Sequence, residues 1–84
     1  MEQIIAVAIH QFGVILSLPS PARHHSIIRN AHEGFNPPIT GEQGFLTSTG
    51  RFVNRRDAWV IAQNAEQMIA HTGPERELYS EDLW

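Results

Sequence analysis

The chain of 84 residues contains no cysteine and no lysine, so all six of its strongly basic side chains are arginines. Without cysteine, neither a disulfide nor a thiolate metal site can support the fold, and without lysine no Schiff base can form. The sequence also lacks an apolar run of the roughly 20 residues that a membrane-spanning helix needs. It begins Met1-Glu2, without the basic residues that open a secretory signal, so we expect a soluble, cytoplasmic protein with no membrane partner.

Charge is sparse and unevenly distributed. The formal net charge of −3 argues against a nonspecific nucleic-acid binder, because such proteins are normally basic. The acidic excess lies in residues 75–84, whose acids are Glu75, Glu77, Glu81 and Asp82. Because this tail ends in Leu83 and Trp84, we expect it to dock on the body of the protein or on a neighbouring subunit.

The length fits a single domain, residues 1–84, with a core only just large enough to fold alone. A hydrophobic content of 42% is typical of a globular chain. A small core without covalent support often gains its remaining stability from self-association. We therefore expect a homo-oligomer.

Two stretches near the N-terminus, Gln3–Ile9 and Val14–Leu18, are rich in apolar and β-branched residues. The short loop between them contains Gly13 and predicts a β-hairpin. Phe45–Thr49 indicates a further short strand, after which Gly50 turns the chain. Both hairpin strands are apolar on both faces, so at least one should be covered on both sides by helix or by a partner subunit.

Two amphipathic helices complete the expected fold. The first should begin with Ser20 as N-cap and Pro21 at its first position, and should stop at Gly34. The second should begin at Asn54, which is a good N-cap. Its apolar face at helical spacing comprises Ala58, Ile61, Ala62, Ala65, Met68 and Ile69. The predicted fold class is α+β: a small antiparallel sheet, made of the hairpin plus a short strand or hairpin, packed with two α-helices in an oligomer.

Positive side chains gather where both predicted helices begin. Arg51, Arg55 and Arg56 surround the second start, and Arg23 and His24 fall in the first turn of the first helix. The helix dipole disfavours cations at this end. The cluster is explained if an anion docks between guanidinium groups and free backbone N–H groups. The alternative, that these are solvated surface arginines, stays open from the sequence alone.

The remaining candidates for chemistry are weaker. His25 and His32 would lie roughly 10 Å apart along a helix, too far to share one metal ion directly. No nucleophile motif and no dinucleotide-binding glycine pattern is present, so no cofactor and no metal are predicted. A histidine could still act as a general acid or base. Phe45 and Phe52 could stack on a nucleotide base, although each is more typical of a core.

The string GEQGFLTSTGRFVNRRDAW, followed by IA and the terminal LYSEDLW, resembles a small family found in phages and prophages. The upstream ARHHSII is similar to the arginine–histidine element of that family. The chain further resembles the first type of phage anti-Thoeris sponge proteins, which fold as a β-sheet with helices and assemble as oligomers. Those proteins sequester cyclic ADP-ribose-like signals, and some bind cyclic oligonucleotides, so that host immune effectors are not activated. The resemblance implies ligand contacts by Arg23, His24, Phe45, Arg51, Asn54 and Arg55.

Three functions remain as hypotheses. The first is a non-enzymatic protein that sequesters a small phosphorylated nucleotide-type ligand, in the host cytoplasm if the chain is phage-encoded. The second is a small phosphodiesterase-like enzyme that uses His24 or His25. The third is a protein-interaction module that acts through its C-terminal tail.

Overall fold

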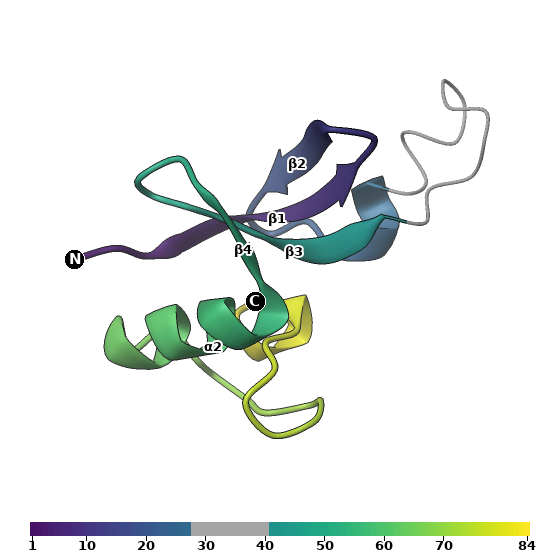
Figure 1. Ribbon diagram of the computed structural model, residues 1–84. Coiled ribbons are helices and arrows are strands. Elements are labelled where there is room, and N and C mark those ends of the chain that lie inside the picture. The colour runs from purple at the N-terminus through teal and green to yellow at the C-terminus, as the bar shows by residue number, and fades with distance from the viewer. Residues whose placement is uncertain (28–40) are drawn as a thin grey trace.

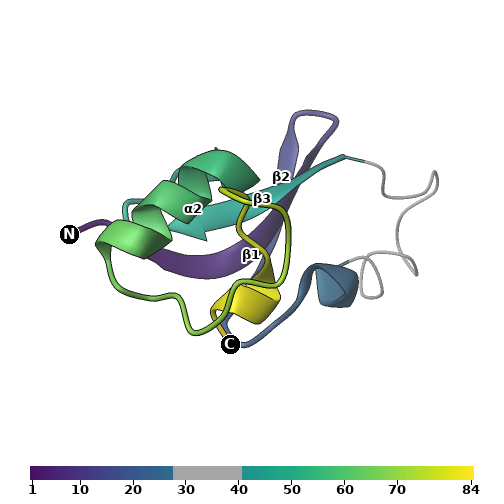
Figure 2. The same ribbon diagram turned by 90° about the horizontal axis from the view of Figure 1, so that it is seen from below.

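The computed structural model describes residues 1–27 and 41–84. Its centre is a four-stranded antiparallel sheet with the strand order β2-β1-β3-β4. The strands are β1 (Ile4–Gln11), β2 (Val14–Pro19), β3 (Glu42–Thr47) and β4 (Phe52–Asn54). The helix α2 (Arg55–Asn64) and the C-terminal segment lie together on one side of this sheet (Figures 1 and 2). The α+β class expected from the sequence is therefore confirmed.

The hairpin of β1 and β2 turns through Phe12 and Gly13, which both have positive φ angles of 53° and 73°. This is the backbone that a two-residue hairpin turn requires, and glycine adopts it without steric cost. Gln11 therefore faces Val14 across the turn, and the register continues to Ala6 opposite Pro19. The strand that is buried on both faces is β1, which lies between β2 and β3.

The start of α2 is as predicted, whereas its end is not. Asn54 accepts a hydrogen bond from the Asp57 amide at 2.8 Å and so caps the first turn. The helix ends at Asn64 instead of continuing to Ile69. Beyond it, Glu66 has a positive φ of 56°, and the Gln67 side chain bonds both backbone groups of Ile4. These long-range bonds take the place of another helical turn.

The predicted cap of the first helix is wrong. The Ser20–Pro21 bond is cis, and the Ala22 amide donates to the Pro19 carbonyl in a turn. Helical structure begins only at His24 and is described as far as Ile27. The rest of that predicted helix, together with its stop at Gly34, lies outside the described residues.

The C-terminal segment packs on the same core as α2. Leu78 is fully buried and Leu83 is 8% exposed, beneath the sheet residues Val7 and Phe45. The short 3-10 helix η1 (Ser80–Asp82) turns the chain so that the Trp84 indole donates to the Ala22 carbonyl at 2.8 Å. This contact fastens the end of the chain beside the helical turn that begins at His24.

Candidate functional site

An open cleft lies where the helical turn at 24–27, β3, the start of α2 and the C-terminal segment meet. Its volume is about 260 Å³. The residues that line it come from four separate parts of the chain: Arg23, His24, His25, Gln43, Arg55, Tyr79, Ser80 and Glu81. We call it the Arg23–Arg55 cleft. It brings together two of the arginines, and two of the histidines, that the sequence singled out.

Arg55 lies at the first position of α2 and reaches across to the C-terminal segment. Its Nη1 donates to the Leu78 carbonyl at 2.7 Å, and its Nη2 donates to the side-chain oxygen of Gln43. The guanidinium group also lies 4.0 Å from the centre of the Tyr79 ring. Burial lowers the pKa of Arg55 from 12.5, against the raising effect of Tyr79 and nearby acids. The group still stays charged at neutral pH.

Arg23 is the less satisfied of the two cleft arginines. Its Nη1 lies 3.7 Å from the Glu81 carboxylate, which is an ion pair but too long for a hydrogen bond. This nitrogen is buried and has no hydrogen-bond partner within residues 1–27 and 41–84. A buried donor without an acceptor is costly, roughly 1–3 kcal/mol. The cleft therefore holds a desolvated cationic donor with spare hydrogen-bonding capacity.

His24 forms the inner wall of the cleft and is only 7% exposed. Its Nε2 lies 2.8 Å from the Gly44 carbonyl, which can only accept, so Nε2 carries the proton. The ring meets Phe45 edge-to-face with centroids 5.0 Å apart. Burial lowers the pKa of His24 from 6.5, while the bond to Gly44 opposes that shift. His24 is thus neutral at pH 7, and its ring packs against Phe45 in the core.

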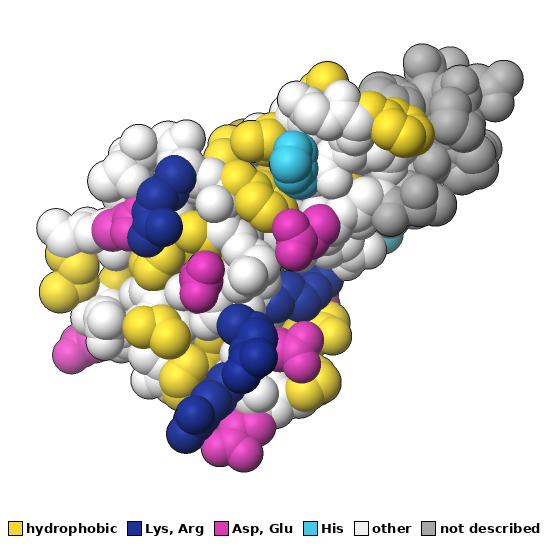
Figure 3. Space-filling view, in the orientation of Figure 1, with side chains coloured by type: hydrophobic (Ala, Val, Ile, Leu, Met, Phe, Trp, Pro, Cys, Tyr) yellow, Lys and Arg dark blue, Asp and Glu magenta, His cyan; other side chains and the backbone are white. Residues whose placement is uncertain are grey.

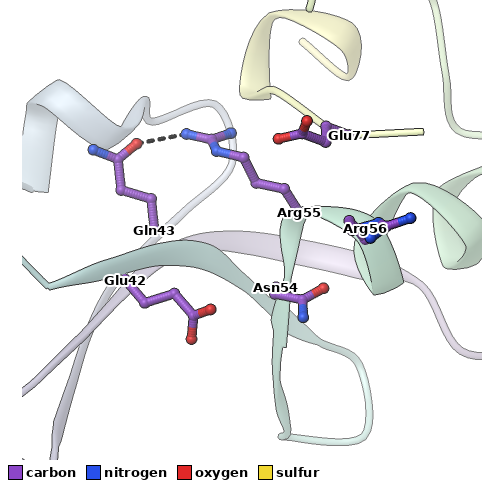
Figure 4. Close-up of a pocket in the computed structure, with 6 residues that line it drawn as sticks. All are labelled: Glu42, Gln43, Asn54, Arg55, Arg56 and Glu77. Carbon is purple, nitrogen blue, oxygen red and sulfur yellow. Dashed lines mark hydrogen bonds between the residues drawn. The ribbon is translucent and has the colours of Figure 1, made fainter. Parts of the chain in front are cut away.

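A second hollow adjoins the first and shares Gln43 and Arg55 with it. Its volume is about 250 Å³, and its lining residues are Glu42, Gln43, Asn54, Arg55, Arg56 and Glu77. Figure 4 shows Gln43 and Arg55 pointing toward one another above Asn54, with Glu77 beyond Arg55. The side-chain oxygen of Asn54 already accepts the capping hydrogen bond from the Asp57 amide. This hollow carries as many acids as arginines, so it attracts anions less than the Arg23–Arg55 cleft does.

Two of the residues that the resemblance implied line neither the cleft nor the hollow. Phe45 has no exposed surface and packs inside the core, so neither of its faces is open to a base. Arg51 sits between β3 and β4 and forms a bidentate pair with Glu2, with nitrogen–oxygen distances of 2.7 and 2.8 Å. The hydrogen bond from Arg51 lowers the pKa of Glu2 to about 2. Arg51 lines neither the cleft nor the hollow.

Sequence reasoning did not single out Gln43, Tyr79 or Glu81 as site residues. Gln43 shows no local signal, because it matters only through its pairing with Arg55. Tyr79 and Glu81 belong to a tail whose apolar anchors predicted docking but not the place of docking. Among the described residues, no group of three or more His, Asp or Glu side chains is placed to hold a metal ion. Within the same residues, no helix is long and apolar enough to cross a membrane.

Together the fold and the cleft define a small α+β domain with an arginine-lined surface site and a packed C-terminal segment. Residues 3–84 match the model of the family described as Phage T4 y16D protein. The chain therefore belongs to this family, as the motif strings indicated for a small phage protein. No curated protein matches the chain, and no solved structure does. The family description names a phage protein and no ligand.

Proposed function

We propose that the protein binds a small phosphorylated ligand in the Arg23–Arg55 cleft and holds it without degrading it. In a phage family, the ligand class that fits this proposal is a cyclic nucleotide or a cyclic ADP-ribose-like immune signal, sequestered in the host cytoplasm. The single observation that carries the proposal is the buried Nη1 of Arg23, which has no hydrogen-bond partner in the described parts of the chain.

Phosphate suits this cleft for two reasons. A guanidinium group presents a planar fork of donors that matches phosphate oxygens, and it stays charged even where burial lowers its pKa. Among residues 1–27 and 41–84, the acid paired with Arg23 is Glu81, at 3.7 Å, and the Glu81 side chain is 52% exposed. A phosphate oxygen at hydrogen-bond distance would replace this loose ion pair with a stronger, charge-assisted bond.

Binding is favoured over catalysis by the state of His24. Its ring is buried, its Nε2 is taken by the Gly44 carbonyl, and its pKa is lowered, so it is poorly placed to exchange protons with a ligand. The exposed neighbour His25 also lines the cleft and is the residue on which the phosphodiesterase alternative depends. Release of a linear nucleotide product, lost in a His25→Gln variant, would favour that alternative.

The tail-mediated interaction is the third candidate. The apolar anchors of the tail are used within the chain, since Leu78 and Leu83 are buried and Trp84 bonds to Ala22. A protein partner would therefore meet mainly the exposed acids of this segment. No specific contact favours that reading over ligand binding.

Titration calorimetry with cyclic ADP-ribose and with a cyclic dinucleotide tests the proposal. We expect binding of at least one probe, and an Arg23→Gln variant should weaken it at least tenfold, about 1.4 kcal/mol. Arg56→Gln serves as the matched control, because it removes an exposed arginine outside this cleft. The bound probe should be recovered chemically unchanged after heat release. Equal affinity of Arg23→Gln and the unmodified protein would overturn the proposal, as would failure of both probes to bind.

A further inference from the structure

In the parts of the chain that the structure describes, β2 is an edge strand of the sheet. Among the described residues β2 pairs with β1 and with no other strand. Edge strands are normally protected by charged side chains, prolines or bulges, because their free backbone groups can recruit another strand. Here only Pro19, at the end of the strand, offers such protection. Val14–Leu18 carries none.

The side chains of this hairpin are apolar and exposed. Phe12 is 70% exposed, Val14 48% and Ile15 44%. No aspartate, glutamate, lysine or arginine occurs from Gln3 to Ala22. Figure 3 shows most of the charged side chains over the lower and left parts of one face, whereas the upper part around β2 is yellow and white apart from one cyan histidine patch. This is the region where two acidic copies can approach without bringing like charges together.

The backbone register defines which groups of β2 face outward. In a hairpin with a two-residue turn, the residues flanking the turn form a hydrogen-bonded pair, here Gln11 and Val14. By alternation, Leu16 also bonds toward β1. The backbone N–H and C=O groups of Ile15 and Ser17 therefore point to the open edge.

We propose that β2 pairs antiparallel with β2 of a second copy about a two-fold axis at Leu16, which joins two sheets into one. Ile15 then faces Ser17 of the second copy, and each such pair exchanges two backbone hydrogen bonds. Leu16, only partly buried against the core, meets its symmetry mate. The strand thus complements itself, as an isologous interface requires, which is why a second copy is the occupant.

The row of alternate side chains on the core side supports this choice of occupant. Leu16 and Leu18 pack against the core of one copy but remain partly exposed, and Val14 is exposed by about half. In the proposed register Val14 lies opposite Leu18 of the second copy. The two hydrophobic cores therefore become continuous across the strand pair. The apolar surface of these side chains that is exposed to solvent in one copy becomes buried.

The first test measures the mass in solution by sedimentation equilibrium of the full chain. We expect an even-numbered assembly that an Ile15→Lys variant dissociates, with at least a tenfold increase in the dissociation constant. Val60→Lys is the matched control, because Val60 is 52% exposed on α2 and the change in charge is identical. Circular dichroism establishes that both variants fold. A monomeric wild type, or an equal effect of the two variants, would overturn the proposal.

The second test uses the absence of native cysteine. In a non-hydrogen-bonded antiparallel pair the Cα atoms lie about 4.5 Å apart, which is within the range of a disulfide. Leu16→Cys should therefore form a covalent dimer on mild oxidation, whereas Val60→Cys should not. Equal cross-linking of both variants, or none at Leu16→Cys, would place the contact elsewhere and overturn the proposed pairing.

Discussion

The guanidinium group of Arg55 lies over the ring of Tyr79, 4.0 Å from its centre, while one nitrogen of the same group donates to the Leu78 carbonyl. The Leu78 amide in turn donates to the Arg55 carbonyl at 2.9 Å. The first residue of α2 thus holds the segment that forms the far wall of the cleft. The shape of the Arg23–Arg55 cleft and the packing of the C-terminal segment therefore depend on one side chain.

Replacing Arg55 should destabilise the fold as well as the cleft. Arg55→Ala removes hydrogen bonds from a partly buried charged donor and a cation–π contact, so we expect the free energy of unfolding to fall by about 2–3 kcal/mol. Arg56→Ala removes an exposed side chain next to it and should change this value by less than about 0.5 kcal/mol. Urea denaturation measures both. Similar losses for the two variants would contradict the role assigned to Arg55.

The buried side chain of Asp82 holds the C-terminal segment together through hydrogen bonds to Thr72 and Tyr79. Its buried carboxylate accepts bonds from the Thr72 amide and hydroxyl, at 2.7 and 2.9 Å, and from the Tyr79 amide at 3.0 Å. Asp82→Asn turns one acceptor into a donor that faces another donor, so we expect a loss of about 1.5–3 kcal/mol. The exposed Glu75→Gln, with the same change in charge, is the control. Thermal unfolding of both variants should show a lower midpoint for Asp82→Asn alone.

Burial of His24 predicts how stability depends on pH. Its pKa in the folded chain is lowered from 6.5, so below about pH 6.5 the unfolded chain binds a proton that the folded chain does not. The free energy of unfolding should therefore fall as the pH drops from 6.5 toward the lowered pKa, and this contribution is constant above 6.5. His24→Gln should flatten the curve in that window. An unchanged slope in the His24→Gln variant would contradict this assignment.

Position 44 requires glycine, because the Val53 carbonyl and the Phe52 ring lie too close to its Cα atom to leave room for a side chain. A Cβ atom there would meet the Val53 carbonyl oxygen and would lie 2.6 Å from the Phe52 ring. The Gly44 carbonyl also accepts the bond from His24. We expect Gly44→Ala to cost about 1–3 kcal/mol in urea denaturation, because the crowded groups must move. Adding Phe52→Leu to that variant should recover part of the loss; a further loss of full size would show that the ring is not the obstacle.

Much of the fold followed from short-range patterns. The apolar runs around Phe12-Gly13 predicted the hairpin, and Asn54 predicted the start of α2. The end of α2 was missed because Gln67 bonds to Ile4 at the other end of the chain, a contact with no local signature. Ser20 does not cap a helix, because the Ala22 amide, which a cap at Ser20 would bind, donates to the Pro19 carbonyl instead.

The candidate site was predictable only in part. The sequence placed Arg23, His24 and Arg55 in one group, and the structure brings these three to one cleft. It placed Arg51 in the same group because Arg51 is near Arg55 in the chain. In the structure, Arg51 instead neutralises Glu2 on a different surface.

What the sequence determined by itself is local: which residues turn, which cap a helix and which alternate between core and solvent, since these depend on neighbours a few positions away. Only the tertiary structure decided which arginines share a cleft. A guanidinium group is carried on a long side chain, and its partner is whichever carbonyl, ring or carboxylate the folded chain brings within reach. For Arg55 that partner came from Leu78 and Tyr79, and for Arg23 a full partner is still missing among the described residues.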